Sequence, residues 1–168
     1  MSGWIEFSLA LVAFLAAHVL PMKVKTRLTT ALGRRGYVIA YSALSLALLY
    51  WLILASGRAP YVELWPQPVW SRWLVNLVMS AAFIIGAIGG FGGVMIGFSL
   101  WAGSHLIANG DLAHVLFFGL LLGYAVTGLM WGARLTIKVT PLRIGIGVAA
   151  WAALFHLHPL LIGMSPLP

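Results

Sequence analysis

The sequence contains no cysteine, which excludes disulfide bonds, thiolate nucleophiles and iron–sulfur clusters. Charge is also scarce, because only 8% of the 168 residues are charged and three of these are acidic. The three acids, Glu6, Glu63 and Asp111, are far apart in the sequence, and Glu6 is expected at the level of the lipid headgroups. Without paired carboxylates, a phosphate-binding glycine loop or a nucleophile elbow, the chain lacks the residues that hydrolysis and phosphoryl transfer require.

What the sequence has in abundance is apolar surface. Hydrophobic residues make up 62% of the chain, and the mean hydropathy is +1.01. A soluble domain of this size needs more charge to face water, so the sequence predicts an all-α integral membrane protein without a soluble domain. The net charge of +7 comes from basic residues in short loops beside apolar segments, where anionic lipid headgroups explain them better than nucleic acid does.

The length of the apolar blocks predicts the number of membrane spans. Residues 73–108 form one block that would be about 54 Å long as a single helix, well beyond a hydrocarbon core of about 30 Å. This block contains a glycine-rich stretch, Gly86–Gly93, where the chain can reverse direction. We therefore expect a bundle of about six transmembrane helices in a single domain, residues 1–168. The expected spans are residues 4–22, 37–56, 73–88, 94–108, 112–133 and 144–163.

The distribution of basic residues predicts the orientation of these spans. The first span is expected to be permanent rather than a cleaved signal peptide, because its positive charges follow it. With six spans and an outside N-terminus, only Arg58 and Arg72 fall on the outer side, in keeping with the positive-inside bias. Both termini are then extracytoplasmic. The remaining basic residues fall inside: Lys23, Lys25, Arg27, Arg34, Arg35, Arg134, Lys138 and Arg143.

Histidines are the main chemical inventory inside the predicted spans. His18, His105 and His158 lie in apolar segments, where an interhelical hydrogen bond and metal ligation are the two interpretations to weigh. Two histidines on different helices can hold a haem iron without any cysteine or carboxylate. Asp111 is expected to cap the helix that follows it, with His114 hydrogen-bonded in its first turn.

Glycines recur at the four-residue spacing that lets membrane helices approach closely. Close packing within the fold is the favoured interpretation, and the same faces are candidate contacts for membrane partner proteins or for a homo-oligomer. The repeats are Gly89, Gly93 and Gly97, then Gly119 with Gly123, and Gly128 with Gly132.

Several motifs, in order along nearly the whole chain, resemble the NnrU family of membrane proteins. The motifs are Phe14–His18, Leu32–Tyr37, Ala59–Pro66, Leu100–Leu106, Ala108–Ala113, Leu157–Pro159 and Gly163–Pro166. The resemblance implies a multi-pass protein of the bacterial inner membrane, associated with nitrite and nitric oxide reduction in denitrification.

The zeta-carotene isomerase of plants and cyanobacteria is similar to this family and uses haem b. Its two haem-ligating histidines match His18 and His105 by motif position, and His158 is an alternative ligand. The resemblance thus implies haem b in redox or isomerisation chemistry on an apolar small molecule. The other interpretation is a non-enzymatic accessory or assembly protein of nitrite and nitric oxide respiration, with structural histidines. The sequence names no substrate and leaves open whether the chain is an enzyme.

The chain departs from the family pattern at two places. Family members usually have a polar loop ending in Arg-His-Pro, and the matching positions here are Phe91, Gly92 and Gly93. Where the isomerase has a cysteine, this chain has Ala102, so a thiol-dependent exchange of haem ligands is excluded.

Overall fold

The computed structural model describes residues 2–167, apart from the side chains of residues 19–23. Within this part the chain is all-helical, as the composition predicts, and the one extended pairing is an isolated bridge between Glu63 and Asp111. The chain divides into two compact units, Met1–Tyr61 and Val62–Pro168, called unit 1 and unit 2 below. The helices are α1 (Gly3–Arg58), α2 (Val69–Ile88), α3 (Gly90–Ala108), α4 (Leu112–Trp131) and α5 (Pro141–Ile162).

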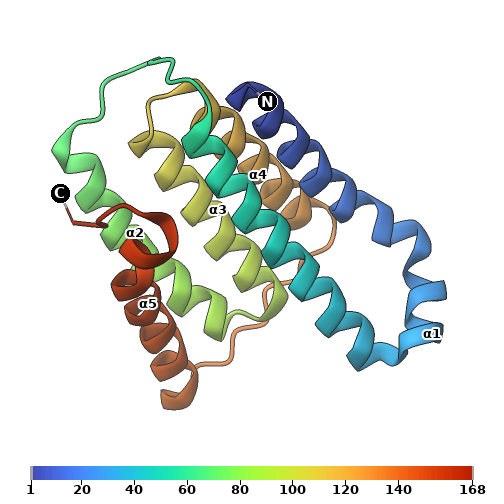
Figure 1. Cartoon of the computed structure of the whole chain (residues 1–168). Coiled ribbons are helices and arrows are strands. Elements are labelled where there is room, and N and C mark those ends of the chain that lie inside the picture. The colour runs from blue at the N-terminus through green and yellow to red at the C-terminus, as the bar shows by residue number, and fades with distance from the viewer. Residues whose placement is uncertain (1, 168) are drawn as a thin grey trace. The chain divides into compact units, whose positions relative to one another are not determined.

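Unit 1 consists of α1, which doubles back on itself. Its blue N-terminal part and its cyan C-terminal part run side by side in opposite directions (Figure 1). Inside the helix, Gly33 has φ 71° and ψ 161°, a conformation that ends one helical arm and starts another. Glycine is suited to this position because it lacks the Cβ that penalises positive φ. Unit 1 is therefore a helical hairpin with a first arm before Gly33 and a second arm at residues 34–58.

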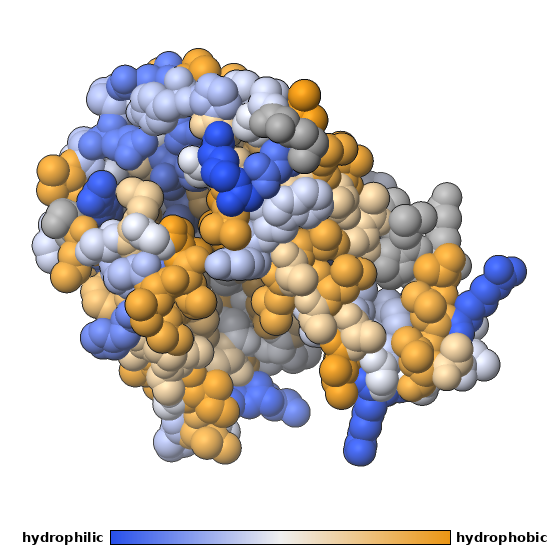
Figure 2. All heavy atoms as spheres, in the orientation of Figure 1, coloured by the Kyte–Doolittle hydropathy of each residue, from blue (hydrophilic) through white to orange (hydrophobic). Residues whose placement is uncertain are grey.

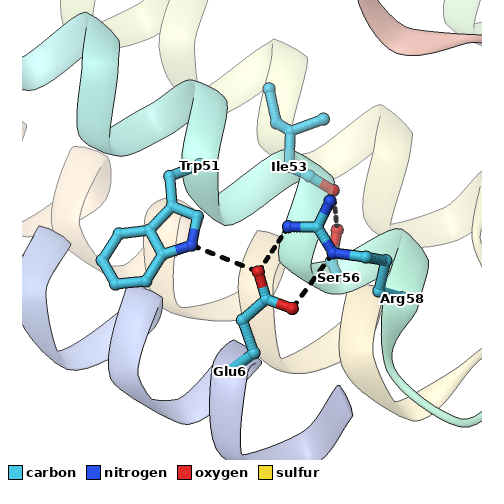
Figure 3. A network of polar contacts seen from close by, with 5 residues as sticks. All are labelled: Glu6, Trp51, Ile53, Ser56 and Arg58. Carbon is cyan, nitrogen blue, oxygen red and sulfur yellow. Dashed lines mark hydrogen bonds and ion pairs between the residues drawn. The ribbon is translucent and has the colours of Figure 1, made fainter. Parts of the chain in front are cut away.

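The two ends of this hairpin are held together by an ion pair. Arg58 donates to the Glu6 carboxylate through Nη2 and, at 3.0 Å, through Nε (Figure 3). The indole Nε1 of Trp51 donates to the same carboxylate at 3.4 Å. The level of Glu6 relative to the headgroups stays a prediction, and the structure adds that its partners come from the other arm. Because a straight helix would hold residues 6 and 58 about 78 Å apart, these bonds require the reversal.

In unit 2, α2 and α3 form an antiparallel pair with almost no connecting loop. The helix break falls at Gly89 and Gly90, inside the glycine-rich stretch where the sequence predicts a reversal. Gly90 has φ 60°, a left-handed conformation that favours glycine. A Cβ on Gly97 would lie 2.6 Å from the carbonyl oxygen of Ala82, so the two helices approach each other at backbone distance. The glycine spacing in α3 thus serves packing within the fold.

An extended segment, residues 134–138, runs across the turn between α2 and α3. The amide of Gly92 donates to the Arg134 carbonyl at 3.1 Å, and the amides of Thr136 and Lys138 donate to carbonyls of the turn at 3.1 and 2.8 Å. A Cβ on Gly92 would lie 2.5 Å from the Leu135 nitrogen. Phe91, Gly92 and Gly93, the positions that match a polar loop in the resembled family, are therefore in the first turn of α3, and this segment runs across them.

The opposite end of unit 2 gathers three segments that are distant in the sequence. Leu64 donates its amide to the Gly110 carbonyl at 2.7 Å, and Leu112 donates to Val62 at 2.9 Å. The C-terminal tail returns to α2, because Asn76 Nδ2 donates to the Pro166 carbonyl at 2.9 Å. Unit 2 thus begins and ends at the same end of its own four-helix bundle, just as unit 1 does for its hairpin.

The helices have the length and surface of membrane spans. Large hydrophobic side chains are exposed on every helix, and apolar residues cover much of the visible face in Figure 2. The chain is therefore a multi-pass membrane protein. Helices long and apolar enough to cross a membrane are Val24–Arg58, Val69–Ile88, Gly90–Ala108, Leu112–Trp131 and Pro141–Ile162, with Gly3–His18 as a shorter apolar helix. Because Gly33 interrupts the first of these, its crossing part is residues 34–58.

Candidate functional site

His18 lies on the first arm of α1, in the part of unit 1 that is flanked by aromatic rings. Its Nδ1 donates to the Phe14 carbonyl, one helical turn earlier, at 2.7 Å. The imidazole lies against the Phe14 ring, with 4.2 Å between centroids, and meets the edge of the Tyr41 ring at 5.8 Å. Since Tyr41 belongs to the second arm, His18 is positioned by both arms of the hairpin.

His105 lies near the C-terminal end of α3 in a corresponding local geometry. Its Nδ1 donates to the Trp101 carbonyl, again one turn earlier, at 2.8 Å. The imidazole contacts the Trp101 ring at 5.7 Å and the Phe118 ring of α4 at 5.1 Å between centroids. Small residues complete this face of α3, because the methyl group of Ala102 is fully buried and Ser104 is nearly so.

These two histidines share a pattern that decides their tautomer. In each case an aromatic residue stands four positions earlier, and its backbone carbonyl accepts the Nδ1–H bond. A carbonyl oxygen can only accept, so Nδ1 carries the proton and the lone pair lies on Nε2. Metal-ligating histidines commonly donate their second ring nitrogen to a backbone carbonyl in this way. His18 belongs to unit 1 and His105 to unit 2.

An aromatic cluster surrounds His105 within unit 2. Trp101 meets Phe117 and Phe118 edge to face, at 6.3 and 5.5 Å between centroids. Phe117 and Phe118 stack on each other at 4.5 Å, and both are almost fully buried. Large aromatic side chains in such contacts fix one another's orientation. The side of His105 toward α4 is therefore rigid and dry.

His158, the alternative ligand, is held differently. It lies near the end of α5, is half-buried, and donates from Nδ1 to the Met164 carbonyl of the C-terminal tail at 2.7 Å. His158 and His105 both belong to unit 2, and the lone pair of His158 also lies on Nε2.

Asp111 and His114 form two hydrogen bonds, of which the sequence predicts one. Asp111 caps α4 by accepting the His114 amide at 3.2 Å, as predicted. In addition, its second oxygen accepts from the His114 Nδ1 at 2.7 Å, and the carboxylate is nearly buried, with the residue 5% exposed. The imidazole of His114 stacks on the Phe118 ring, which also contacts His105. The spacing of three residues between Asp111 and His114 is the sequence feature that could have predicted this side-chain bond.

The donor set limits which metal chemistry these residues suit. Within the described part of the chain, no three histidine or acidic side chains gather where they could hold a metal ion together. Zinc and calcium sites need at least that many protein ligands, whereas a haem iron needs only two axial ligands. Pairs of imidazoles from apolar helices therefore fit haem iron better than a free metal ion.

A family is found by comparison with known proteins. A family model described as NnrU protein matches residues 6–166, which is nearly the entire chain. The searches of curated proteins and of solved structures returned no match.

Proposed function

This chain belongs to the NnrU family, and we propose that it is a membrane haem protein that holds one b-type haem through His18 and His105. The observation that carries the proposal is the shared geometry of these two side chains. Each donates Nδ1–H to the carbonyl four residues earlier, at 2.7 Å for His18 and 2.8 Å for His105. That bond directs the lone pair of each imidazole to Nε2, the nitrogen that would bind iron.

The surroundings of both histidines support a haem rather than a hydrated site. Phe14 and Tyr41 flank His18, and Trp101 and Phe118 flank His105, so each imidazole is oriented by rings instead of by charged groups. Apolar, aromatic surroundings accommodate a macrocycle and keep water from the iron.

Electron transfer is the activity that these ligands favour. A b-type haem supplies one-electron redox chemistry, and two imidazole ligands leave no open position for a substrate at the iron. In the isomerase that resembles this family, a cysteine follows the tryptophan. Here that position is Ala102, whose buried methyl group cannot replace an imidazole as a ligand. We therefore propose electron transfer in nitrogen-oxide metabolism first, and isomerisation of an apolar substrate second.

His158 is the second candidate for the ligand that accompanies His105. Both residues belong to unit 2. The bond from His158 to Met164 at 2.7 Å leaves its Nε2 lone pair available to a metal. His18 remains the first choice, because the His18 bond to the turn before it reproduces that of His105.

The test is an absorption spectrum of the purified full chain, prepared without oxygen from cells supplied with haem. We expect a Soret band and sharp bands of the reduced protein, with one haem per chain. Single replacements His18→Ala and His105→Ala should each remove most of the haem. His156→Ala is the matched control, because His156 is exposed in α5 and is not among the proposed ligands. It should retain the full amount.

Each alternative gives a different result. If His158→Ala removes haem while His18→Ala does not, the pair is His105 with His158. If the chain and all its variants bind no haem and remain folded, the proposal is wrong. An accessory role with structural histidines would then be favoured. Carbon monoxide provides a second readout, since a reduced iron with two firm imidazole ligands should show no spectral change.

A further inference from the structure

We propose that a groove on the second arm of α1 binds an anionic phospholipid, with Arg34 and Arg35 on the phosphate and Val38 and Ile39 along an acyl chain. These four residues line a shallow, open groove of about 430 Å³ in unit 1. All four are exposed. This inference is independent of the proposed haem.

The two arginines have no partner within the described part of the chain. Three other arginines, by contrast, are bonded to the protein: Arg58 to Glu6, Arg72 to the Leu167 carbonyl and Arg143 to the Ala87 carbonyl. Arg34 and Arg35 make neither a hydrogen bond nor an ion pair with any described residue. Two adjacent guanidinium groups without a carboxylate attract an anion, and a phosphate matches their fork of donors.

No acidic side chain competes for this position. The chain has three acids, and each described one has a place elsewhere. Glu6 pairs with Arg58 at the other end of the hairpin, and Asp111 pairs with His114 in unit 2. Glu63 belongs to unit 2, where its backbone pairs with that of Asp111. The positive charge of Arg34 and Arg35 is therefore balanced from outside the chain.

The spacing of the four residues matches the cross-section of a lipid leaflet. Val38 and Ile39 follow the arginines by one helical turn, which places them about 6 Å farther along the helix axis. The headgroup layer of a leaflet is about 5–8 Å thick, so a phosphate at the arginines would put the start of its acyl chains at this apolar pair. A free phosphate would contact the arginines alone. The presence of Val38 and Ile39 in the same groove therefore favours a lipid.

Gly33 fixes the place of this groove at the start of the second arm. The left-handed turn there makes Arg34 and Arg35 the first residues of the new arm, at the end where α1 reverses. In the orientation shared by Figures 1 and 2, hydrophilic side chains project from that end of unit 1. By the positive-inside bias this end faces the cytoplasmic leaflet, where anionic lipids attract basic side chains.

The experiment measures lipid binding to the full chain in a neutral detergent, by native mass spectrometry. Phosphatidylglycerol is compared with phosphatidylcholine of the same acyl chains. We expect tighter binding of the anionic lipid. At about 1 kcal/mol for each basic side chain near anionic lipid, Arg34→Gln combined with Arg35→Gln should weaken phosphatidylglycerol about 30-fold.

Two control variants distinguish lipid binding in this groove from non-specific attraction of the lipid to positive charge. Arg134→Gln with Lys138→Gln removes the same charge from two exposed side chains of unit 2, and it should change the affinity less than about twofold. Val38→Ser combined with Ile39→Ser leaves both arginines in place and should also weaken the binding of phosphatidylglycerol.

Four results would each overturn the assignment. Both lipids could bind equally, or both charge variants could lose affinity equally. The apolar variant could bind as tightly as the unchanged chain. Inorganic phosphate at a millimolar level could displace the lipid, which would show a site for a free anion.

Discussion

Replacing Gly97 by alanine tests whether α2 and α3 are held at backbone distance. The added Cβ would lie 2.6 Å from the Ala82 carbonyl oxygen, which is 0.8 Å less than the 3.4 Å of an ordinary contact. The neighbouring atoms at this site are backbone atoms of a packed helix, so no side-chain rotation relieves the contact. The two helices would have to move apart along the face that leads to His105.

The matched control is Gly103→Ala in the same helix. Its Cβ would have as nearest neighbour the Leu122 side chain at 4.0 Å, which is an ordinary van der Waals contact without a clash. Alanine raises helix propensity by up to about 1 kcal/mol at either position, and this gain cancels when the two variants are compared. The difference isolates the steric cost, which is about 1–3 kcal/mol for overpacking in a tight core.

The assay is reversible unfolding by sodium dodecyl sulfate in mixed micelles, followed by circular dichroism. We expect Gly97→Ala to unfold at less denaturant than the unchanged chain, and Gly103→Ala at the same or more. Equal loss in both variants would refute the argument, since it would show that the Ala82 contact does not limit how closely the helices pack.

Three further predictions concern the side chains that tie each unit together. Asp111→Ala removes the cap of α4 and the partner of His114, so it should cost about 1 kcal/mol in the same unfolding assay, whereas Asp111→Asn should keep most of the cap. No loss from the alanine variant would argue against the cap. Leu121→Ala empties a fully buried position of α4 and should cost about 2–5 kcal/mol, and a cost below about 1 kcal/mol would contradict its burial. Glu6→Gln and Arg58→Gln should each lower the thermal midpoint, and the double variant should be no worse than either single one. Additive losses would mean that the two side chains act separately.

The local features of the fold could be predicted from the sequence because they depend on neighbouring residues. Gly86–Gly93 marks the reversal between α2 and α3, and the break at Gly89 and Gly90 follows from glycine's tolerance of positive φ. Asp111 caps α4 because a short carboxylate before an apolar helix reaches the open amides. The apolar lengths likewise indicate which segments cross the membrane.

The non-local contacts could not be predicted, because they depend on how distant segments come into register. The pairing of Glu6 with Arg58 could not be predicted, because it requires α1 to fold back on itself. Residues 134–138 are held across the α2–α3 turn by backbone hydrogen bonds. Such bonds do not depend on side-chain identity, so the sequence does not indicate them. At the candidate site, the position of His105 in an apolar helix is visible in the sequence, whereas its contact with Phe118 of α4 is not.

The central claim, that two imidazoles of this chain hold one haem iron, is tested most directly by electron paramagnetic resonance of the oxidised, purified protein. Two imidazole ligands predict a low-spin signal that is lost in both His18→Ala and His105→Ala. A high-spin signal in the unchanged chain, or a low-spin signal that survives either replacement, would contradict the claim.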